Sequence, residues 1–385
     1  MLPTQATSPP VRLDPFLSQK IRFWSLVAMV LLIYVHAYNL HPRYLQPFTP
    51  VQEPLGPGTW LQYLLANGLL RFRIPILFAI SGYLFARRDG AEPHGQRVRR
   101  RLRTLGLPYL LWSGLWLLAL WALEQFPLTK QAVIDAEISP FWPRQLLSQL
   151  SGGELLARWL VEPAPFQLWF LRNLLVYNLA YPWLKNVLLR RPTAYFWVAG
   201  LLWFFMVPLP LIEGEGLLFF GLGAWLALRD KDVCTPPRWL RLRPLAALWL
   251  GVCLLKTWLA FQVGPPFSMP LAVAMLALHK IGEISGMLVA WFGLDGLVRW
   301  CMALAGFRWL TGFSFMIYVL HVPTVNYATE LALRYGQAVP HVHLLTYLLF
   351  PLLVVAASAG LGALLRGALP RAYAVLTGGR GLATS

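Results

Sequence analysis

Four residues that can carry charge or move a proton lie inside long apolar stretches of this sequence: His36, Arg71, Arg73 and His321. A charged side chain at bilayer depth costs roughly 2.5–3.5 kcal/mol, so it is retained mainly where it faces a polar cavity or a partner. A histidine exchanges protons near neutral pH because its ordinary pKa is about 6.5, and an arginine stabilises negative charge that develops during a reaction. Together these residue types indicate a polar reaction site inside a membrane domain.

The spacing of the two histidines from nearby arginines places them at similar depth. His36 follows Arg22 by fourteen residues and His321 follows Arg308 by thirteen, which corresponds to about 21 Å and about 20 Å of helix. A single histidine inside a membrane is more often a packing residue than a catalyst. Two histidines at matched depth, beside buried arginines, favour an aqueous reaction site.

Arg71 and Arg73 lie near the middle of the apolar stretch 60–87. Two residues apart on a regular helix, they would point about 200° away from each other. Pro75 follows two residues later and distorts a helix, so we expect a broken helix whose two arginines line one cavity. The alternative is that one arginine makes a structural ion pair while the other reaches along the helix.

Apolar stretches of membrane length recur along the chain, whose composition is 57% hydrophobic and 13% charged. These stretches are apolar on every side, unlike the alternating strands of an outer-membrane barrel. We therefore predict an all-α fold, a polytopic transmembrane helical bundle of about ten helices. The predicted spans cover residues 22–40, 60–87, 104–123, 166–185, 194–212, 215–229, 244–263, 270–295, 309–333 and 342–365.

Positive charge is distributed unevenly among the loops. With a cytoplasmic N-terminus, most of the 33 lysines and arginines fall on the cytoplasmic side, including those of the run "RRDGAEPHGQRVRRRLR". This bias fits the positive-inside rule with both termini cytoplasmic, in a multipass protein of the cytoplasmic (inner) membrane. Topology thus explains the net charge of +17 without a nucleic-acid partner. The predicted domains are a cytoplasmic tail (1–20), a transmembrane domain (21–367) and a second cytoplasmic tail (368–385).

Other polar residues inside the spans are expected to pair with one another. Glu283 lies four residues after His279 and three after Lys280, so it can bond to either along one helix, and Lys256 has the same structural interpretation. The external segment 124–165 contains "SGGELLARWLVEP", which is either a short amphipathic helix at the membrane surface or an ordered loop packed on helix ends. The sequence contains no metal-binding spacing, serine elbow or phosphate-binding glycine loop.

Five short motifs follow one another along nearly the whole chain. They are "KIRFWSLVAMVLLIYVHAYN" with His36, "RFRIPILFAISGYLF" with Ser81 and Gly82, "RVRRRLRTLGLPYLLW" with Arg99, Arg103 and Pro108, "QLWFLRNL" with Trp169, and "SFMIYVLHVP" with Tyr318 and His321. Their order resembles that of the acyltransferase-3 family, the multipass membrane O-acyltransferases that modify glycans and lipid-linked sugars.

The resemblance implies a transfer reaction. An acyl group, usually acetyl, passes from acyl-CoA on the cytoplasmic side to a hydroxyl of a glycan or a lipid-linked sugar, so the implied partners are these two substrates and membrane lipids. Acyl-CoA is then a donor substrate, and no cofactor is bound permanently. His36 acts as the general base, and Arg71, Arg73 and His321 complete the catalytic group. The residues expected to bind the donor are Arg22, Ser81, Arg99, Arg103 and Trp169.

The first span departs from the family pattern at one position. The family commonly has an arginine eleven residues before the first-span histidine, where this chain has Ser25. Arg22 lies three residues earlier, about 4.5 Å along the helix and on a neighbouring face. Arg22 is therefore the candidate to replace the family's arginine.

Two other classes of protein remain open. A secondary transporter for a small anionic or sugar-linked substrate would also need charged residues inside the membrane, but it would move its substrate unchanged. A sensor or structural membrane subunit would only pair its buried charges with each other. Labelling of an acceptor that depends on acyl-CoA separates the enzyme from both.

Overall fold

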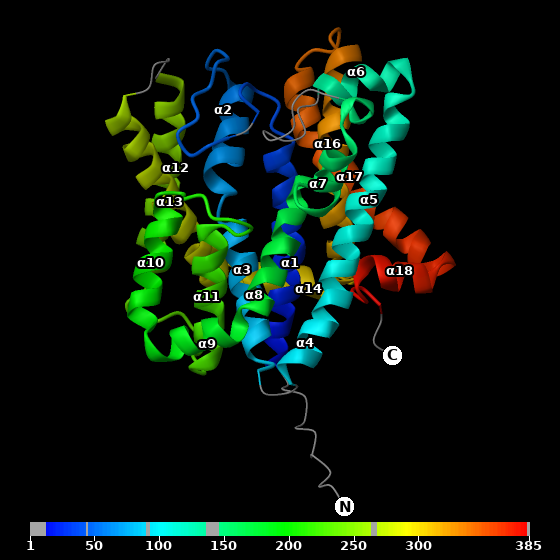
Figure 1. Cartoon of the computed structure of the whole chain (residues 1–385). Helices are drawn as coiled ribbons and strands as arrows, with labels where there is room; N and C mark the ends of the chain where they lie inside the picture. The colour runs from blue at the N-terminus through cyan, green and yellow to red at the C-terminus, as the bar shows by residue number, and fades with distance from the viewer. Residues whose placement is uncertain (1–12, 44, 90–92, 136–145, 263–267, 383–385) are drawn as a thin grey trace, which may run out of the picture.

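The computed structural model describes residues 13–382 apart from 44, 90–92, 136–145 and 263–267. Every regular element in these residues is a helix (Figure 1), which confirms the predicted all-α class. In chain order the α-helices are α1 (Pro15–His36), α2 (Pro57–Tyr63), α3 (Arg73–Ala86), α4 (His94–Arg101), α5 (Leu107–Glu124), α6 (Pro127–Asp135), α7 (Gly152–Leu160), α8 (Trp169–Leu179), α9 (Tyr181–Arg190), α10 (Pro192–Phe204), α11 (Gly214–Leu228), α12 (Leu242–Gln262), α13 (Met269–Gly293), α14 (Asp295–Ala303), α15 (Ala305–Thr311), α16 (Ser314–Tyr335), α17 (Val342–Ala368) and α18 (Pro370–Thr377). Short π-helical or 3-10 segments also occur: η1 (Leu64–Leu69), η2 (Leu102–Gly106), η3 (Leu147–Gln149) and η4 (Phe166–Leu168).

Among the described residues, six helical segments are long and apolar enough to cross a membrane, namely 15–36, 57–86, 94–124, 242–262, 269–293 and 342–368. They correspond to six of the predicted spans. The other predicted spans take shorter or interrupted forms: 166–185 divides into η4, α8 and α9, 194–212 overlaps α10, 215–229 is the apolar helix α11, and 309–333 falls in α15 and α16. The total of ten crossings stays a prediction.

Helix α1 runs through the middle of the bundle, with α10 to α13 on one flank and α5 and α6 on the other (Figure 1). It packs against α3, α16 and α17. Next to it, α3 and α11 approach so closely that a Cβ atom at Gly82 would come within 2.0 Å of the Phe220 carbonyl oxygen, and one at Gly223 within 1.9 Å of the Ala79 carbonyl oxygen. Gly82, the second residue of the Ser-Gly motif, therefore allows this helix contact.

The first helix begins earlier than predicted. The Asp14 side chain accepts a backbone hydrogen bond at 2.9 Å and caps α1. Lys20 is fully buried, and its ammonium lies 2.7 Å from the Asp295 carboxylate. Residues 15–20 thus belong to the bundle rather than to a tail, while 1–12 lie outside the described part of the chain.

The C-terminal segment is also folded onto the bundle. Helix α18 packs on α17 and α5, where the Trp112 indole N–H donates to the Leu376 carbonyl oxygen at 2.9 Å. Arg380 then donates to the Thr104 carbonyl oxygen at 2.8 Å. Gly378 has a φ of +61°, at a place where a side chain would clash with the Thr104 backbone. The described residues of the predicted tail 368–385 therefore contact the bundle, and their assignment to a cytoplasmic tail stays a prediction.

After η3 the chain returns alongside α5 instead of staying at its end. The Glu124 carboxylate at the end of α5 accepts from the Leu147 backbone N–H at 2.6 Å. Helix α7 then follows α5 back toward its start, where the Tyr109 hydroxyl donates to the Leu160 carbonyl oxygen at 3.0 Å. Most of the segment "SGGELLARWLVEP" is helical, which agrees with the first of the two predicted alternatives. The helix packs against the first turns of α5.

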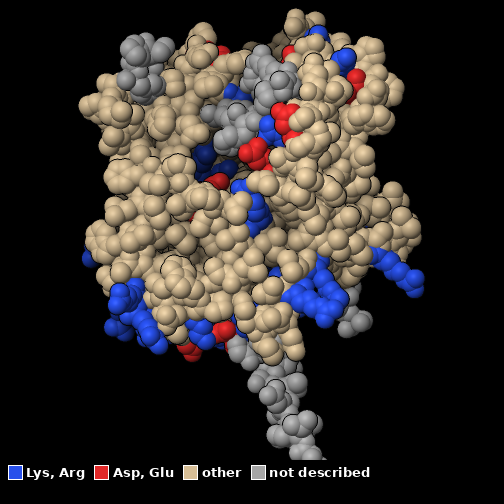
Figure 2. All heavy atoms as spheres, in the orientation of Figure 1, with Lys and Arg blue, Asp and Glu red and all other residues tan. Residues whose placement is uncertain are grey.

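Basic side chains gather at the end of the bundle where α1 begins. Figure 2 shows lysines and arginines concentrated along that edge, with few at the opposite edge of the viewed face. Exposed members near this end include Arg88, Arg99, Arg190 and Arg191. This arrangement fits the predicted orientation, with the N-terminal end toward the cytoplasm.

Candidate active site

The two predicted histidines lie side by side in the bundle. The ring centroids of His36 and His321 are 5.4 Å apart, with 33° between the ring planes. His36 is the last residue of α1 and is partly exposed, whereas His321 is fully buried in the middle of α16. The sequence predicted that these residues lie at similar depth, and the structure adds that their side chains, nearly three hundred residues apart in sequence, are in contact.

Hydrogen bonds fix the ring of His321. Its Nδ1 atom lies 2.7 Å from the Tyr318 carbonyl oxygen and 3.2 Å from the Ile317 carbonyl oxygen. A carbonyl oxygen only accepts, so Nδ1 carries the hydrogen and Nε2 carries the lone pair. The Nε2 atom is buried and has no hydrogen-bond partner among the described residues. His321 is therefore held as an unused proton acceptor next to His36.

A break in α16 positions His321. Val322 has non-helical angles (φ −110°, ψ 136°), and Pro323 follows it. The Gln167 amide donates to the Val322 carbonyl oxygen at 2.7 Å, and the Tyr318 hydroxyl donates to the Gln167 carbonyl oxygen at 2.6 Å. Gln167 thus binds the turn that precedes the break and the carbonyl oxygen at the break itself. Sequence analysis singled out the motif "QLWFLRNL" for Trp169 but missed its first residue, although a buried glutamine was a signal for such a bond.

Arg71 and Arg73 come close to the histidines because the second apolar segment is not one helix. The π-helix η1 ends at Leu69, a turn follows, and α3 begins at Arg73. Pro75 sits in the first turn of α3, where its missing N–H is tolerated. Both arginines lie within electrostatic range of His36. The predicted broken helix is confirmed, with its break before the proline.

Both arginines bind backbone carbonyl oxygens. Arg71 donates from Nε to the Ala66 oxygen at 2.9 Å and from a terminal nitrogen to the Leu45 oxygen at 3.0 Å. Arg73 donates to the Leu70 oxygen at 2.8 Å, and its buried Nε has no hydrogen-bond partner among the described residues. Neither arginine makes an ion pair within the described ranges. The described residues thus show no ion pair of the kind that the alternative requires, although Glu215 and Glu283 lie within electrostatic range of both arginines.

Further charged residues surround this group. Glu215, in the first turn of α11, lies within electrostatic range of Arg73, Lys280 and Glu283. Glu215 was missed from the sequence, although the acidic stretch "EGEG" (213–216) stands at the start of an apolar segment. Figure 2 shows a hollow near the middle of the viewed face in which acidic and basic side chains are visible.

The predicted pairing of Glu283 is confirmed. Its carboxylate lies 3.1 Å from the His279 Nε2 atom and 3.2 Å from the Lys280 ammonium, and all three residues are buried. His279 also contacts Lys256, which was expected to pair structurally, with 3.0 Å between its Nδ1 atom and the lysine nitrogen. These four residues connect α12 to α13.

The residues predicted to bind the donor are not gathered at one point. Arg22, Arg99 and Arg103 are exposed on α1, α4 and η2. Ser81 is partly buried in α3. Trp169 begins α8 and its ring contacts those of Phe78 and Phe170. Their role in donor binding stays a prediction.

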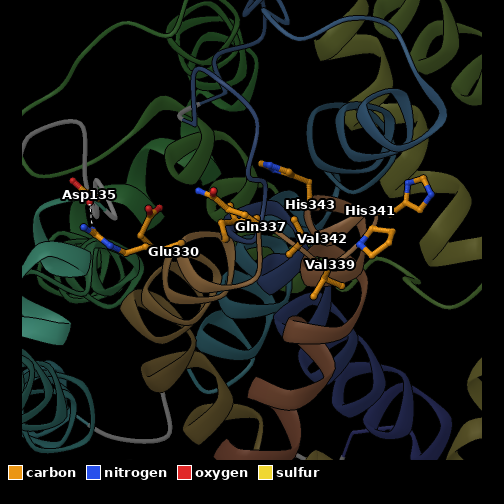
Figure 3. A pocket seen from close by; sticks show the side chains of 10 residues that line it. Asp135, Glu330, Gln337, Val339, His341, Val342 and His343 are labelled. Atoms are coloured by element: carbon orange, nitrogen blue, oxygen red, sulfur yellow. Dashed lines mark hydrogen bonds and ion pairs between the residues drawn. The ribbon is translucent and has the colours of Figure 1, made fainter.

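An open cavity lies at the far end of α16 (Figure 3). Its volume is about 920 Å³, and its polar lining includes Asp135, Glu330, Arg334, Gln337, His341 and His343. Arg334 donates to the Asp135 carboxylate at 2.9 Å, and Glu330 pairs with Arg43. Glu330 follows His321 by nine residues, which corresponds to about 13.5 Å of helix.

A family model described as an acyltransferase domain matches residues 23–365, which is most of the chain. The chain belongs to the acyltransferase-3 family. This acyltransferase transfers groups other than amino-acyl groups, and all four predicted catalytic residues lie within the matched part. Among the described residues, no group of three side chains is arranged to hold a metal ion.

One relative matches almost end to end. The succinoglycan biosynthesis protein ExoH of Rhizobium meliloti (strain 1021) is 27% identical to this acyltransferase over 376 residues. The match covers 96% of this chain and 94% of the relative. No solved structure matches the chain.

Proposed function

We propose that this acyltransferase moves an acyl group, in the first instance acetyl, from cytoplasmic acyl-CoA to a hydroxyl of a glycan or lipid-linked sugar of the cell envelope. Family membership supports acyl transfer, and the name of the relative from Rhizobium meliloti points to a polysaccharide as the modified product. The observation that carries the proposal is the pair of neighbouring histidines, one with an unused ring nitrogen, beside two arginines that make no ion pair among the described residues.

His36 is the general base in this mechanism. It takes the proton of the acceptor hydroxyl while the hydroxyl oxygen attacks the thioester carbonyl carbon. The carbonyl oxygen becomes an oxyanion, which the guanidinium groups of Arg71 and Arg73 stabilise. When the tetrahedral intermediate collapses, the carbon–sulfur bond breaks, the new ester remains on the acceptor, and the proton held by His36 passes to the CoA sulfur.

His321 has the second role. Since His36 is partly exposed and His321 fully buried, His36 meets the acceptor directly. The Nε2 lone pair of His321 accepts a hydrogen bond from the acceptor or from the protonated His36. Either contact stabilises the state in which the proton has left the hydroxyl.

The two substrates approach from opposite ends. The basic end near the start of α1 suits the phosphates of CoA, with Arg22, Arg99 and Arg103 exposed there. The glycan acceptor approaches from the end that carries the open cavity of Figure 3, whose side chains offer hydrogen-bond donors and acceptors. This arrangement requires the cytoplasmic membrane, where acyl-CoA is available on one face only.

The test is binding and hydrolysis of radiolabelled acetyl-CoA by the purified protein in detergent, with His36→Ala and Arg73→Ala as variants. We expect saturable binding by all three proteins and release of acetate by the wild type alone. Succinyl-CoA in a parallel series compares the acyl groups. If wild-type protein of confirmed fold neither binds nor cleaves any acyl-CoA but moves an unmodified sugar-linked solute across proteoliposomes, the transporter interpretation replaces this one.

A further inference from the structure

The break between η1 and α3 leaves several backbone carbonyl oxygens without a helical partner. Three cationic side chains bind carbonyl oxygens at this point. Arg71 binds the Ala66 oxygen at 2.9 Å, Arg73 binds the Leu70 oxygen at 2.8 Å, and Lys256 binds the Asn67 oxygen at 2.6 Å. The C-terminal end of a helical segment carries partial negative charge, which favours cations there.

Lys256 differs from the two arginines because it comes from another helix. It projects from α12, is 1% exposed, and crosses to the Asn67 carbonyl in η1. It also lies 5.7 Å from the centre of the Tyr63 ring at the end of α2. Lys256 therefore ties the break to a helix that contributes none of the catalytic group.

A chain of polar contacts holds Lys256 in this position. Its ammonium donates to the His279 Nδ1 atom at 3.0 Å, so the other ring nitrogen of His279 carries the hydrogen and faces the Glu283 carboxylate at 3.1 Å. Glu283 also receives the Lys280 ammonium at 3.2 Å. Lys256, His279 and Glu283 thus each have a polar partner on either side, which leaves Lys256 little freedom to move away from Asn67.

A buried ammonium with no direct carboxylate partner is costly, and it is retained where it has a specific task. Here the ammonium binds the segment that also positions Arg71. The Asn67 carbonyl belongs to the same short segment whose Ala66 carbonyl binds Arg71. A shift of that segment would move the Arg71 guanidinium and, through the following turn, the start of α3 at Arg73.

We propose that Lys256, held by His279 and Glu283, is a positioning residue that fixes η1 so that Arg71 and Arg73 face the reacting carbonyl. The inference rests on the proposed transfer reaction. Lys256 touches neither substrate. Its effect is on the placement of the two arginines, and displacement of a catalytic group by about 1 Å is enough to lower a rate about 100-fold.

The variants are Lys256→Met, which removes the ammonium but keeps a flexible side chain, and Lys256→Arg, which retains a cation with several donors. Lys20→Met is the matched control, because Lys20 is also a fully buried lysine but pairs with Asp295 at the start of α1. Two readouts are taken on protein of confirmed thermal stability: kcat and KM for acetyl-CoA, and backbone hydrogen–deuterium exchange of residues 60–72.

We expect Lys256→Met to lower kcat about 10- to 100-fold, with an unchanged KM for acetyl-CoA and faster exchange in 60–72. Lys256→Arg should recover a measurable part of kcat, and Lys20→Met should change neither readout. Combining Lys256→Met with Arg71→Ala should lower kcat less than the product of the two single effects. Unchanged kcat and exchange in Lys256→Met, with an active wild type, overturn the inference. An inactive wild type contradicts the proposed reaction. In that case hydrogen–deuterium exchange in residues 60–72 still tests whether Lys256 holds η1 through the Asn67 carbonyl.

Discussion

The Nδ1 atom of His321 lies 2.7 Å from the carbonyl oxygen of Tyr318, one turn earlier in α16, and this bond determines which ring nitrogen is free to react. The same turn carries the Tyr318 hydroxyl bond to Gln167, so ring orientation and the break in α16 depend on one set of contacts. Backbone carbonyl oxygens orient the His321 ring. In a serine hydrolase triad, by contrast, a carboxylate orients the histidine.

His321→Asn tests the role of the free nitrogen. The asparagine amide retains a donor for the Tyr318 carbonyl but has nothing in the place of Nε2. We expect the thermal midpoint to stay close to that of the wild type and kcat to fall about 10- to 100-fold. His321→Ala, which also removes the donor, should lower both quantities. Wild-type kcat in His321→Asn would show that Nε2 has no part in the reaction.

Arg71 and Arg73 should differ in how they fail. Arg73→Ala removes one backbone bond and the cation, so we expect kcat to fall about 100- to 1,000-fold while the protein stays folded. Arg71→Ala should cause a similar loss of activity and also lower the thermal midpoint, because Arg71 joins η1 to the Leu45 carbonyl. Arg87→Ala, which breaks a surface pair with Asp230, is the control. Full activity in both Arg71→Ala and Arg73→Ala would contradict their assignment.

The open cavity at the end of α16 predicts a separate effect on the acceptor. Arg334→Ala removes the bond to Asp135 in the cavity wall. Arg334 follows His321 by thirteen residues, about 20 Å of helix. We expect a several-fold higher KM for the glycan acceptor and an unchanged rate of acetyl-CoA hydrolysis without acceptor. The control is Arg158→Ala, which removes the pair between Arg158 on α7 and Glu162. It should change neither the acceptor KM nor the rate of acetyl-CoA hydrolysis. Equal acceptor KM values in the two variants would show that the cavity does not bind the acceptor.

Gly82 provides a test of the fold. In Gly82→Ala the new methyl group meets the Phe220 carbonyl at 2.0 Å, so α3 and α11 must separate, and overpacking of this kind costs about 1–3 kcal/mol or more. We expect a lower thermal midpoint and a lower yield of folded protein. Gly95→Ala, where nothing lies within 4 Å, should be neutral or slightly stabilising. A wild-type midpoint in Gly82→Ala would mean that the helices do not touch there.

Much of this site is visible in the sequence because membrane burial makes polar residues conspicuous. His36 and His321 were predicted at matched depth, and they are neighbours. The two arginines were predicted at a break in a helix, and Arg71 lies in the turn that interrupts the helix while Arg73 begins α3. The location of the break was not predictable from Pro75, because a proline is accommodated in the first turn of a new helix and the π-helix precedes it. Gln167 and Glu215 were missed because each lies at the start of an apolar helix, where a polar residue is ordinary.

The ends of the chain were harder to predict because their contacts are nonlocal. Lys20 looks like one of several topology-setting cations until Asp295 is placed beside it. Residues 370–382 have neither membrane length nor a motif, and their attachment depends on Trp112 and Thr104 far away in the sequence. Composition and periodicity indicate whether a segment is buried or exposed, but they do not indicate which distant segment packs against it.

The attachment of α18 has a practical consequence for anyone who expresses this enzyme. A reporter or purification tag appended beyond Leu382 leaves the indole of Trp112 and the carbonyl of Leu376 joined. A tag that replaces residues 370–382 exposes α5 around Trp112 and removes the hydrogen bond from Arg380 to the Thr104 carbonyl oxygen. The stability of truncated versions in detergent should therefore be measured before a loss of activity is attributed to a missing catalytic residue.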